Sequence, residues 1–311
     1  MENSTSIKRI TAKKVFKDSK IQVRIATLTD KGIGYDTINA ENPDYIISDV
    51  ENVIAPELVG YPAYDQDIID SIICDTSVDS PKATMGTSLS VARAAANSIE
   101  IPLFKHIGGV LSTNLPIVGC SLVSDGLNQL LTIPMAESIG EMVYIYNKLL
   151  SELSEEYAFK NNYGEYISKN LFNDIGKFKG IVANISEEED IEILVGAKIS
   201  EFSPEIEELD YLESSEIIEF DGILCTENID EEADFSKVDP YLMGTLTEMN
   251  YYINYTIEKG LTPTISGNNT SFPHIAIGFK VPFLRANINS KVLNEIWNIE
   301  RILNSPNITR F

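Results

Sequence analysis

The sequence contains few of the residues that build disulfide frameworks and metal centres. It has three cysteines and two histidines among 311 residues. Cys74, Cys120 and Cys225 are far apart and odd in number, so they match neither a disulfide framework nor a metal-ligand pattern. We expect apolar thiols in a reducing compartment, because a chain of this length can bury a sufficient core without cross-links. His106 and His274 form no catalytic pair with a cysteine or serine, and we expect both to have packing or capping roles.

Positive charge is also scarce. The chain has 24 Lys and Arg residues against 47 Asp and Glu residues, which gives a net charge of −23. Binding of nucleic acid requires clustered Lys and Arg, so this balance predicts no nucleic-acid partner. No run of eighteen apolar residues occurs, which predicts no membrane-spanning helix. The first residues, MENSTSIKRITAKK, have no apolar segment behind their charges, so we expect no signal peptide and a cytoplasmic location.

The first third of the chain has the pattern of strands followed by helices. Two segments, 8–16 and 20–30, alternate in the manner of half-buried strands, and a turn at Asp30–Gly32 leads to a third, 33–39. Helical spacing then predicts helices over 48–60 and 64–74, and a third helix after the polar loop and glycine at 80–86. The last of these presents mostly Ala and Ser on its contact face. Because small side chains allow two backbones to approach closely, we expect another element to lie directly against this helix.

After residue 113 the pattern changes to an alternation of strands and helices. Such alternation predicts a parallel sheet or a barrel. The predicted strands are short and apolar, and they cover residues 113–123, 129–134, 180–185, 191–199 and 222–227. The predicted helices cover residues 137–153, 244–260 and 290–303.

The segment from residue 52 to residue 109 carries a family resemblance. It contains Ala55-Pro56, Asp65-Gln66, Asp75-Thr76, the run Pro102-Leu103-Phe104-Lys105, and Gly108-Gly109. In this order they resemble the amino-terminal domain of the enolase family, and weaker similarity continues along the rest of the chain. The resemblance implies an α+β domain over residues 1–112, followed over residues 113–311 by a shortened β/α barrel of the TIM type.

The resemblance also allows a check of the metal site. Enolases remove water from 2-phosphoglycerate with two Mg²⁺ ions, held by acidic strand ends, and a lysine base. The first metal carboxylate falls on Gly196, which offers no ligand, and the second is retained as Glu227. The third lies in a unit that the short spacing between Glu227 and Gly244 implies is deleted. Such a deletion would leave an open or irregular barrel, with an edge covered by a loop, a helix or a partner chain.

The acid/base positions are similarly altered. The catalytic glutamate before the first barrel strand falls on Gln129, which cannot exchange a proton. An acidic loop glutamate falls on Ile175 within residues 174–177. The base lysine falls on Asp239, with Lys237 as an alternative two residues earlier. The last lysine falls on Phe283, while the phosphate loop at 264–267 loses its arginine but keeps Ser266 as a candidate substrate contact.

These losses predict an enolase-like protein without catalytic activity, a pseudoenzyme with a binding, regulatory or structural role. This interpretation implies no cofactor, and it implies a dimer, with a second copy or a true enolase subunit as partner. One alternative is a working phosphopyruvate hydratase of glycolysis that uses Mg²⁺ in a rebuilt site. The other is a different small-molecule binding or lyase role in the barrel mouth, which a pocket with converging polar groups would favour.

Overall fold

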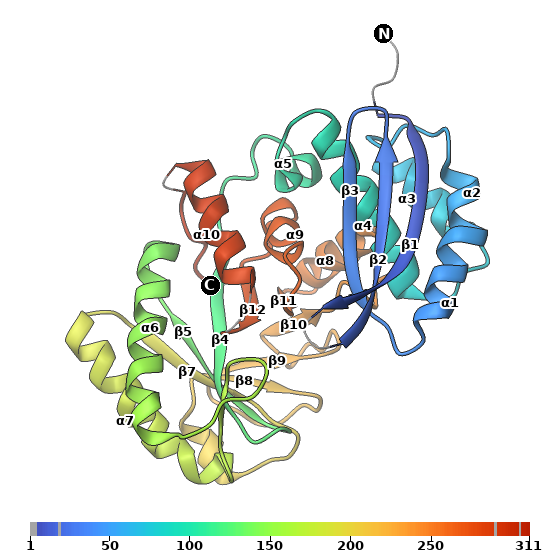
Figure 1. Ribbon diagram of the computed structural model, residues 1–311. Coiled ribbons are helices and arrows are strands. Elements are labelled where there is room, and N and C mark those ends of the chain that lie inside the picture. Colours follow the sequence, from blue (N-terminus) through green and yellow to red (C-terminus); the bar gives the residue numbers. More distant parts are fainter. Residues whose placement is uncertain (1–4, 18–19, 289–290, 305) are drawn as a thin grey trace. The chain divides into compact units, whose positions relative to one another are not determined.

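A computed structural model describes residues 5–17, 20–288, 291–304 and 306–311 (Figure 1). The chain forms two compact units: unit 1 contains Met1–Ser112 and Val238–Asn254, and unit 2 contains Thr113–Lys237 and Tyr255–Phe311. The predicted domains, 1–112 and 113–311, break the chain at the same place but leave 238–254 in the second domain.

Unit 1 consists of a three-stranded antiparallel sheet, in the order β1-β2-β3, and a set of helices. The strands are β1 (Ile7–Lys17), β2 (Lys20–Thr29) and β3 (Ile33–Asn39). The helices before residue 112 are α1 (Pro43–Ser48), the π-helical turn η1 (Asp49–Ile54), α2 (Ala55–Leu58), α3 (Gln66–Cys74), α4 (Pro81–Ser98) and α5 (Leu103–Gly108). Alternate strand residues, such as Val23 and Ile25, form the core with the helices.

Helix α4 has small side chains because β3 lies directly against it. A Cβ atom on Gly34 would lie 2.3 Å from the Ala94 nitrogen and 2.3 Å from the Ser90 oxygen, both backbone atoms. The Ser90 hydroxyl of α4 is bonded to the neighbouring strand β2, where the Thr27 hydroxyl lies 2.7 Å away. The predicted close approach of another element to this helix is confirmed.

The segment Val238–Asn254 is attached to unit 1 by side chains of three elements. Its helix, α8 (Leu246–Glu258), begins with backbone N–H groups that need partners. Ser88 Oγ accepts from Leu246 N at 3.1 Å, and the buried Asp70 carboxylate accepts from Thr247 N at 2.9 Å. Upstream, the Tyr241 hydroxyl donates to Asp36 Oδ2 at 2.8 Å. This part of the chain is therefore held by α3, α4 and β3.

Cys74 is exposed, yet we expect it to react slowly with alkylating reagents. Its partial burial and the Glu248 carboxylate raise the pKa of its thiol from 9.0 to about 11. Two pKa units reduce the thiolate population at pH 8 by about 100-fold. Mass spectrometry of iodoacetamide-treated protein should therefore show alkylation far slower than that of a free cysteine. The Glu248→Gln variant should react faster, and a wild-type rate equal to that of free cysteine would contradict the expectation.

Unit 2 is built around a closed barrel of eight strands. Around the ring the order is β4, β5, β7, β8, β9, β10, β11 and β12, and β12 pairs again with β4. Strand β5 is antiparallel to both neighbours. The ring strands are β4 (Ile117–Ser124), β5 (Gln129–Pro134), β7 (Ile193–Lys198), β8 (Tyr211–Ser214), β9 (Ile223–Thr226), β10 (Phe235–Val238), β11 (Thr262–Ser266) and β12 (Phe283–Asn287). The short β6 (Tyr166–Ile167) pairs with the end of β4 outside the ring.

The closed ring corrects the prediction that a unit after Glu227 is deleted and that the barrel is open or irregular. Strand β10 occupies this place, so the strand is present and only a covering helix is missing. Between β8 and β10 the described residues contain no helix, and between β7 and β8 there is only the 3₁₀ turn η2 (Pro204–Glu208). The segment between Glu227 and Gly244 is too short for a strand and a helix, but it is long enough for a strand.

Helix α7 (Leu171–Glu189) corrects two further predictions. Residues 180–185 were predicted as a strand and 174–177 as a loop, but both lie within this helix. Its buried residues are Leu171, Ile175, Phe178, Val182 and Ile185, at intervals of four and three residues. A short apolar segment such as 180–185 cannot by itself be distinguished from part of a helical stripe, and the whole stripe decides in favour of helix.

The remaining helices of unit 2 follow the barrel strands. They are α6 (Ile139–Glu156), α9 (Phe272–Gly278) and α10 (Lys291–Leu303). Helices α6 and α7 lie side by side (Figure 1). In the part of the chain that the structure describes, no helix is both long and apolar enough to cross a bilayer.

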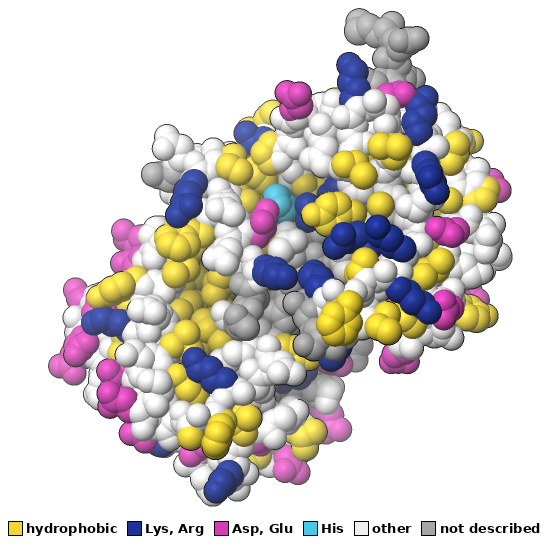
Figure 2. Space-filling view, viewed as in Figure 1, with side chains coloured by type: hydrophobic (Ala, Val, Ile, Leu, Met, Phe, Trp, Pro, Cys, Tyr) yellow, Lys and Arg dark blue, Asp and Glu magenta, His cyan; other side chains and the backbone are white. Residues whose placement is uncertain are grey.

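The net charge conceals a local basic surface on unit 1. Residues 7–31 contain eight of the 24 Lys and Arg residues but only two of the 47 Asp and Glu residues. Figure 2 shows Lys and Arg side chains gathered over sheet β1–β3. The total of −23 therefore does not describe this face.

Candidate functional site at the mouth of the barrel

The barrel interior is filled by two layers of side chains. Alternate residues of a strand point to the same side, so the residue two positions after an interior residue also points inward. The lower layer is aromatic, and ring centroids of Tyr211, Phe235, Phe283 and Phe311 lie 4.9–6.1 Å apart. Each of the first three is followed two residues later by a polar residue at a strand end.

The upper layer is polar. In parallel barrels this carboxyl-terminal edge of the strands is where ligands and catalytic groups are found. Register pairs Gln129 with Lys198 and Lys198 with Glu213, so these three side chains point to the same side of the sheet. The layer consists of Gln129 (β5), Lys198 (β7), Glu213 (β8), Glu227 (after β9), Lys237 (β10), Ser266 (β11) and Arg285 (β12).

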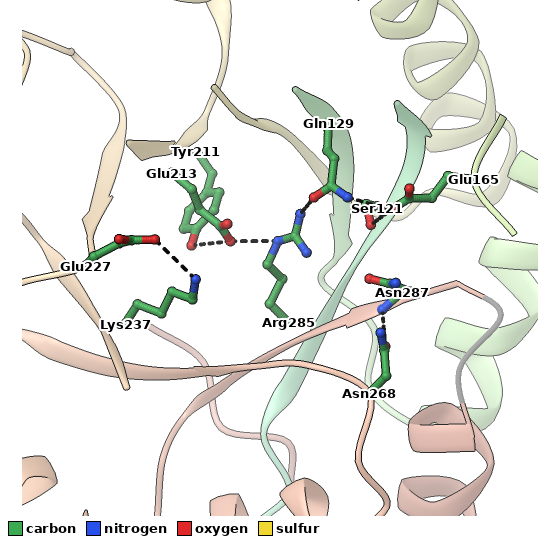
Figure 3. Close-up of polar contacts among 10 residues, drawn as sticks. All are labelled: Ser121, Gln129, Glu165, Tyr211, Glu213, Glu227, Lys237, Asn268, Arg285 and Asn287. Carbon is green, nitrogen blue, oxygen red and sulfur yellow. Dashed lines mark hydrogen bonds and ion pairs between the residues drawn. The ribbon is translucent and has the colours of Figure 1, made fainter. Parts of the chain in front are cut away.

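A buried ion pair lies at the centre of this layer (Figure 3). Arg285 Nε and Glu213 Oε1 are 2.7 Å apart, and the two side chains are only 5% and 8% exposed. The Tyr211 hydroxyl donates to Glu213 Oε1 at 3.3 Å. Burial raises the pKa of Tyr211 well above its usual value, so the phenol keeps the proton that it donates. The Glu213 charge is therefore compensated entirely by the chain itself.

Gln129 joins this ion pair to a second buried carboxylate. Its Oε1 accepts from Arg285 Nη2, and its Nε2 donates to Glu165 Oε1 at 2.8 Å (Figure 3). A guanidinium only donates and a carboxylate only accepts, so the residue between them must do both. A glutamate at position 129 would instead place two carboxylates in contact. A glutamine therefore suits this position, because its amide both accepts from Arg285 and donates to Glu165.

Glu165 is a member of the site that the sequence analysis missed. It is 1% exposed and precedes β6, in a loop that no motif singled out. It accepts hydrogen bonds from Ser121 Oγ and, at 2.8 Å, from Asn161 Nδ2, in addition to Gln129. These donors stabilise its negative charge. Gln129 lies between this carboxylate and Arg285.

A cavity of about 220 Å³ opens beside this network, at the ends of β7 to β10. At its edge Lys237 Nζ and Glu227 Oε1 are 3.5 Å apart. Because the Glu227 side chain is 57% exposed, this pair adds little stability. The lining residues are Leu127, Lys198, Ile199, Ser200, Glu213, Ser214, Ser215, Cys225, Thr226, Glu227 and Lys237.

Cys225 lies in the cavity wall but does not provide a thiolate nucleophile. Its burial and the nearby Glu213 carboxylate raise the pKa of its thiol to about 12. Nucleophilic cysteines require a lowered pKa and an electropositive environment. The chemistry of this cavity therefore belongs to its amines, carboxylates and hydroxyls.

The residues predicted from the sequence are only partly brought together. Gln129, Glu227 and Lys237 lie in the polar layer, and Ser266 is paired in register with Arg285. Gly196 lies one interior position below Lys198. A Cβ atom on Gly196 would lie 2.9 Å from the Tyr211 ring.

Three predicted positions lie away from the mouth. Phe283 belongs to the aromatic layer. Ile175 is buried in α7, and Asp239 follows β10, where its carboxylate accepts from Tyr241 N at 2.9 Å.

Three polar residues of the mouth were missed, two by a shift of two positions and one because its strand was not predicted. The last family lysine was placed on Phe283, and the interior polar residue two positions on is Arg285. The first metal position was placed on Gly196, and two positions on is Lys198. Glu213 lies in β8, a strand that was not predicted. Alternation within the strands is the signal that could have found the first two.

A magnesium centre at the barrel mouth would need free carboxylates. Mg²⁺ needs several oxygen ligands in near-octahedral geometry. Of the two carboxylates in the cavity wall, Glu213 is paired with Arg285 and Glu227 with Lys237. Among the described residues, no group of three or more His, Cys, Asp and Glu side chains is arranged to hold a metal ion.

Fold and site together define a two-unit α/β protein with a closed eight-stranded mixed barrel and a polar barrel mouth. No family model matches the chain. It is 54% identical over 309 residues to "Uncharacterized protein MJ0198" of Methanocaldococcus jannaschii, with 98% of each chain covered, and it belongs to the family of that protein. It is also 30% identical over 148 residues to the enolase of Mycoplasma mobile, a match that covers 42% of this chain and 32% of that enolase.

Proposed function

We propose that the protein is an enolase-like barrel that binds a small polar molecule at its mouth without a metal ion and without hydratase activity. The observation that carries the proposal is the pairing of the mouth carboxylates with cations of the chain. Glu213 is bound to Arg285, and Glu227 lies 3.5 Å from Lys237. A dehydration that depends on Mg²⁺ needs those oxygens as metal ligands.

The hydrogen-bond network supports the same proposal. Gln129 stands where the resemblance implies a proton-transferring glutamate, and both ends of its amide are already bonded. An amide cannot exchange a proton at neutral pH, so Gln129 orients the neighbouring side chains instead. The cavity, with amines, carboxylates and hydroxyls converging on a small volume, has the composition of a ligand site. Association with a second copy or with a true enolase subunit stays a prediction.

One observation favours a second candidate, a lyase or another acid/base role. Lys237 is only 21% exposed, lines the cavity and has Glu227 within 3.5 Å. An amine and a carboxylate in such a position can exchange a proton with a bound molecule. In this case Lys237 would act as a neutral amine: its Nζ would take a proton from the ligand, and Glu227 would stabilise the ammonium that forms.

The test is an assay of phosphoenolpyruvate formation from 2-phosphoglycerate by the purified protein with excess Mg²⁺. We expect no turnover above that of a Glu227→Gln variant. Turnover that disappears in this variant would show that the barrel mouth is a rebuilt enolase site. In parallel, amide NMR spectra recorded with a set of small polar metabolites in EDTA should show shifts confined to the mouth. If no compound shifts these resonances, the binding proposal is wrong.

A further inference from the structure

We propose that the ligand of the mouth cavity is a small hydroxy-monocarboxylate whose carboxylate binds Lys198. This inference rests on the proposed function, because it concerns the same cavity. It adds the class of ligand and the residue that selects it.

Lys198 is placed for this role by its strand. It is the last residue of β7, and its register partners are Gln129 on β5 and Glu213 on β8. Both partners point into the barrel towards Arg285 (Figure 3). Paired residues of neighbouring strands share a face, so Lys198 points to the same side, and its half-buried side chain lines the cavity.

The charges of the cavity wall leave one cation unpaired. Arg285 is paired with Glu213, and Lys237 with Glu227. Within the described ranges no carboxylate forms an ion pair with Lys198. Glu165 is not part of the wall and is already bonded to Ser121, Gln129 and Asn161. A half-buried ammonium without a counter-ion favours an anion beside it.

The anion should carry one charge rather than several. A phosphate ester adds about −1.5 to −2 charges at neutral pH, and a carboxylate adds one more. One unpaired lysine cannot compensate that total beside Glu213 and Glu227, in a chain of net charge −23. A monocarboxylate matches the unpaired charge.

The hydroxyl groups of the wall indicate what else the ligand carries. The Ser200 hydroxyl donates to Asn128 Oδ1 at 3.0 Å and the Thr226 hydroxyl to Asn228 O at 2.8 Å, so both oxygens are left as acceptors. Ser214 Oγ accepts from Glu216 N at 3.1 Å and keeps its own proton to donate. Ser200 lies two positions after Lys198, so a ligand hydroxyl can donate to its Oγ. Ser214 and Thr226 each follow an inward-pointing residue by one position, so their hydroxyls face away from the barrel interior.

Three compounds with the same carbon skeleton test the inference. Glycerate is a hydroxy-monocarboxylate, 2-phosphoglycerate adds a phosphate, and glycerol has no charge. Isothermal calorimetry in EDTA should show glycerate binding more tightly than either of the others. Loss of a charged hydrogen bond weakens binding by about tenfold or more, so Lys198→Met should weaken glycerate binding by at least that factor. Lys169→Met, which removes an exposed lysine outside the cavity wall, should leave it unchanged.

The other outcomes separate this inference from the proposed function. If glycerol binds as tightly as glycerate and Lys198→Met changes neither, the cavity binds neutral ligands and the inference is wrong, although the proposed function stands. Tighter binding of 2-phosphoglycerate, lost in Lys198→Met, would refute the single-charge argument. Failure of all three compounds to bind would also overturn the inference. Conversion of 2-phosphoglycerate would instead overturn the proposed function itself. Unchanged amide spectra outside the mouth would verify that Lys198→Met is folded.

Discussion

Replacement of Arg285 by methionine should lower the free energy of unfolding by about 3–5 kcal/mol, because it leaves the Glu213 carboxylate buried without a counter-ion. The two side chains are 5% and 8% exposed and 2.7 Å apart, so water cannot take the place of the guanidinium. Gln129 Oε1 would also lose its donor. Urea denaturation followed by circular dichroism measures the loss.

The matched control is the double variant Arg285→Met with Glu213→Leu. Replacement of both members of a buried ion pair by apolar residues is often neutral or stabilising, so this variant should recover most of the stability. If Arg285→Met alone costs less than about 1 kcal/mol, which is in the range of an exposed pair, the pair is not buried as described. The Lys237→Met variant provides the comparison, since its partner Glu227 is largely exposed.

Gly34→Ala should be comparably destabilising, for a steric reason. The new Cβ atom would lie 2.3 Å from two backbone atoms of α4, and backbone atoms cannot move aside as the end of a side chain can. Overpacking of a core typically costs 1–3 kcal/mol, and a contact this short should place the cost at about 3 kcal/mol or more. Chemical denaturation of the variant measures it, and failure to fold would agree with the expectation.

Gly180→Ala is the control for a glycine-to-alanine change with free space. Gly180 lies exposed in α7, and among the described residues no atom beyond its chain neighbours and its own helix backbone is within 4 Å of the position that its Cβ would take. Alanine is favoured over glycine in a helix by about 1 kcal/mol, so this variant should be slightly more stable than the wild type. Equal effects of the two substitutions would contradict the close approach of β3 to α4.

The sequence was most informative where local pattern and packing agree. Alternation identified the three strands of unit 1, and the Ala and Ser side chains of α4 indicated a close neighbour. The sequence could not show that this neighbour is Gly34, because about sixty residues separate the two. Pattern failed in α7, where a short apolar segment at 180–185 resembled a strand. Barrel closure was also missed, because β8 and β10 are four residues each and have no helix between them.

The site was less predictable for a related reason. Matching to the enolase pattern by spacing placed two functions on Gly196 and Phe283, and in both strands the polar interior residue lies two positions further on. An insertion or deletion in a connecting loop shifts a match that is made by counting residues. The alternation within a strand still shows which of its residues point into the barrel. Glu165 could not be found in this way, because it lies in a loop and reaches the site only through its contacts with Gln129 and Ser121.

The most direct test of the account is the affinity for glycerate, measured by calorimetry in EDTA and again with excess Mg²⁺. Lys198, Lys237 and Arg285 supply the positive charge at the barrel mouth, so the dissociation constant should be the same in both solutions. Binding that occurs only with Mg²⁺, and that is lost in Glu227→Gln, would show that carboxylates of the mouth hold a metal ion and would contradict the account.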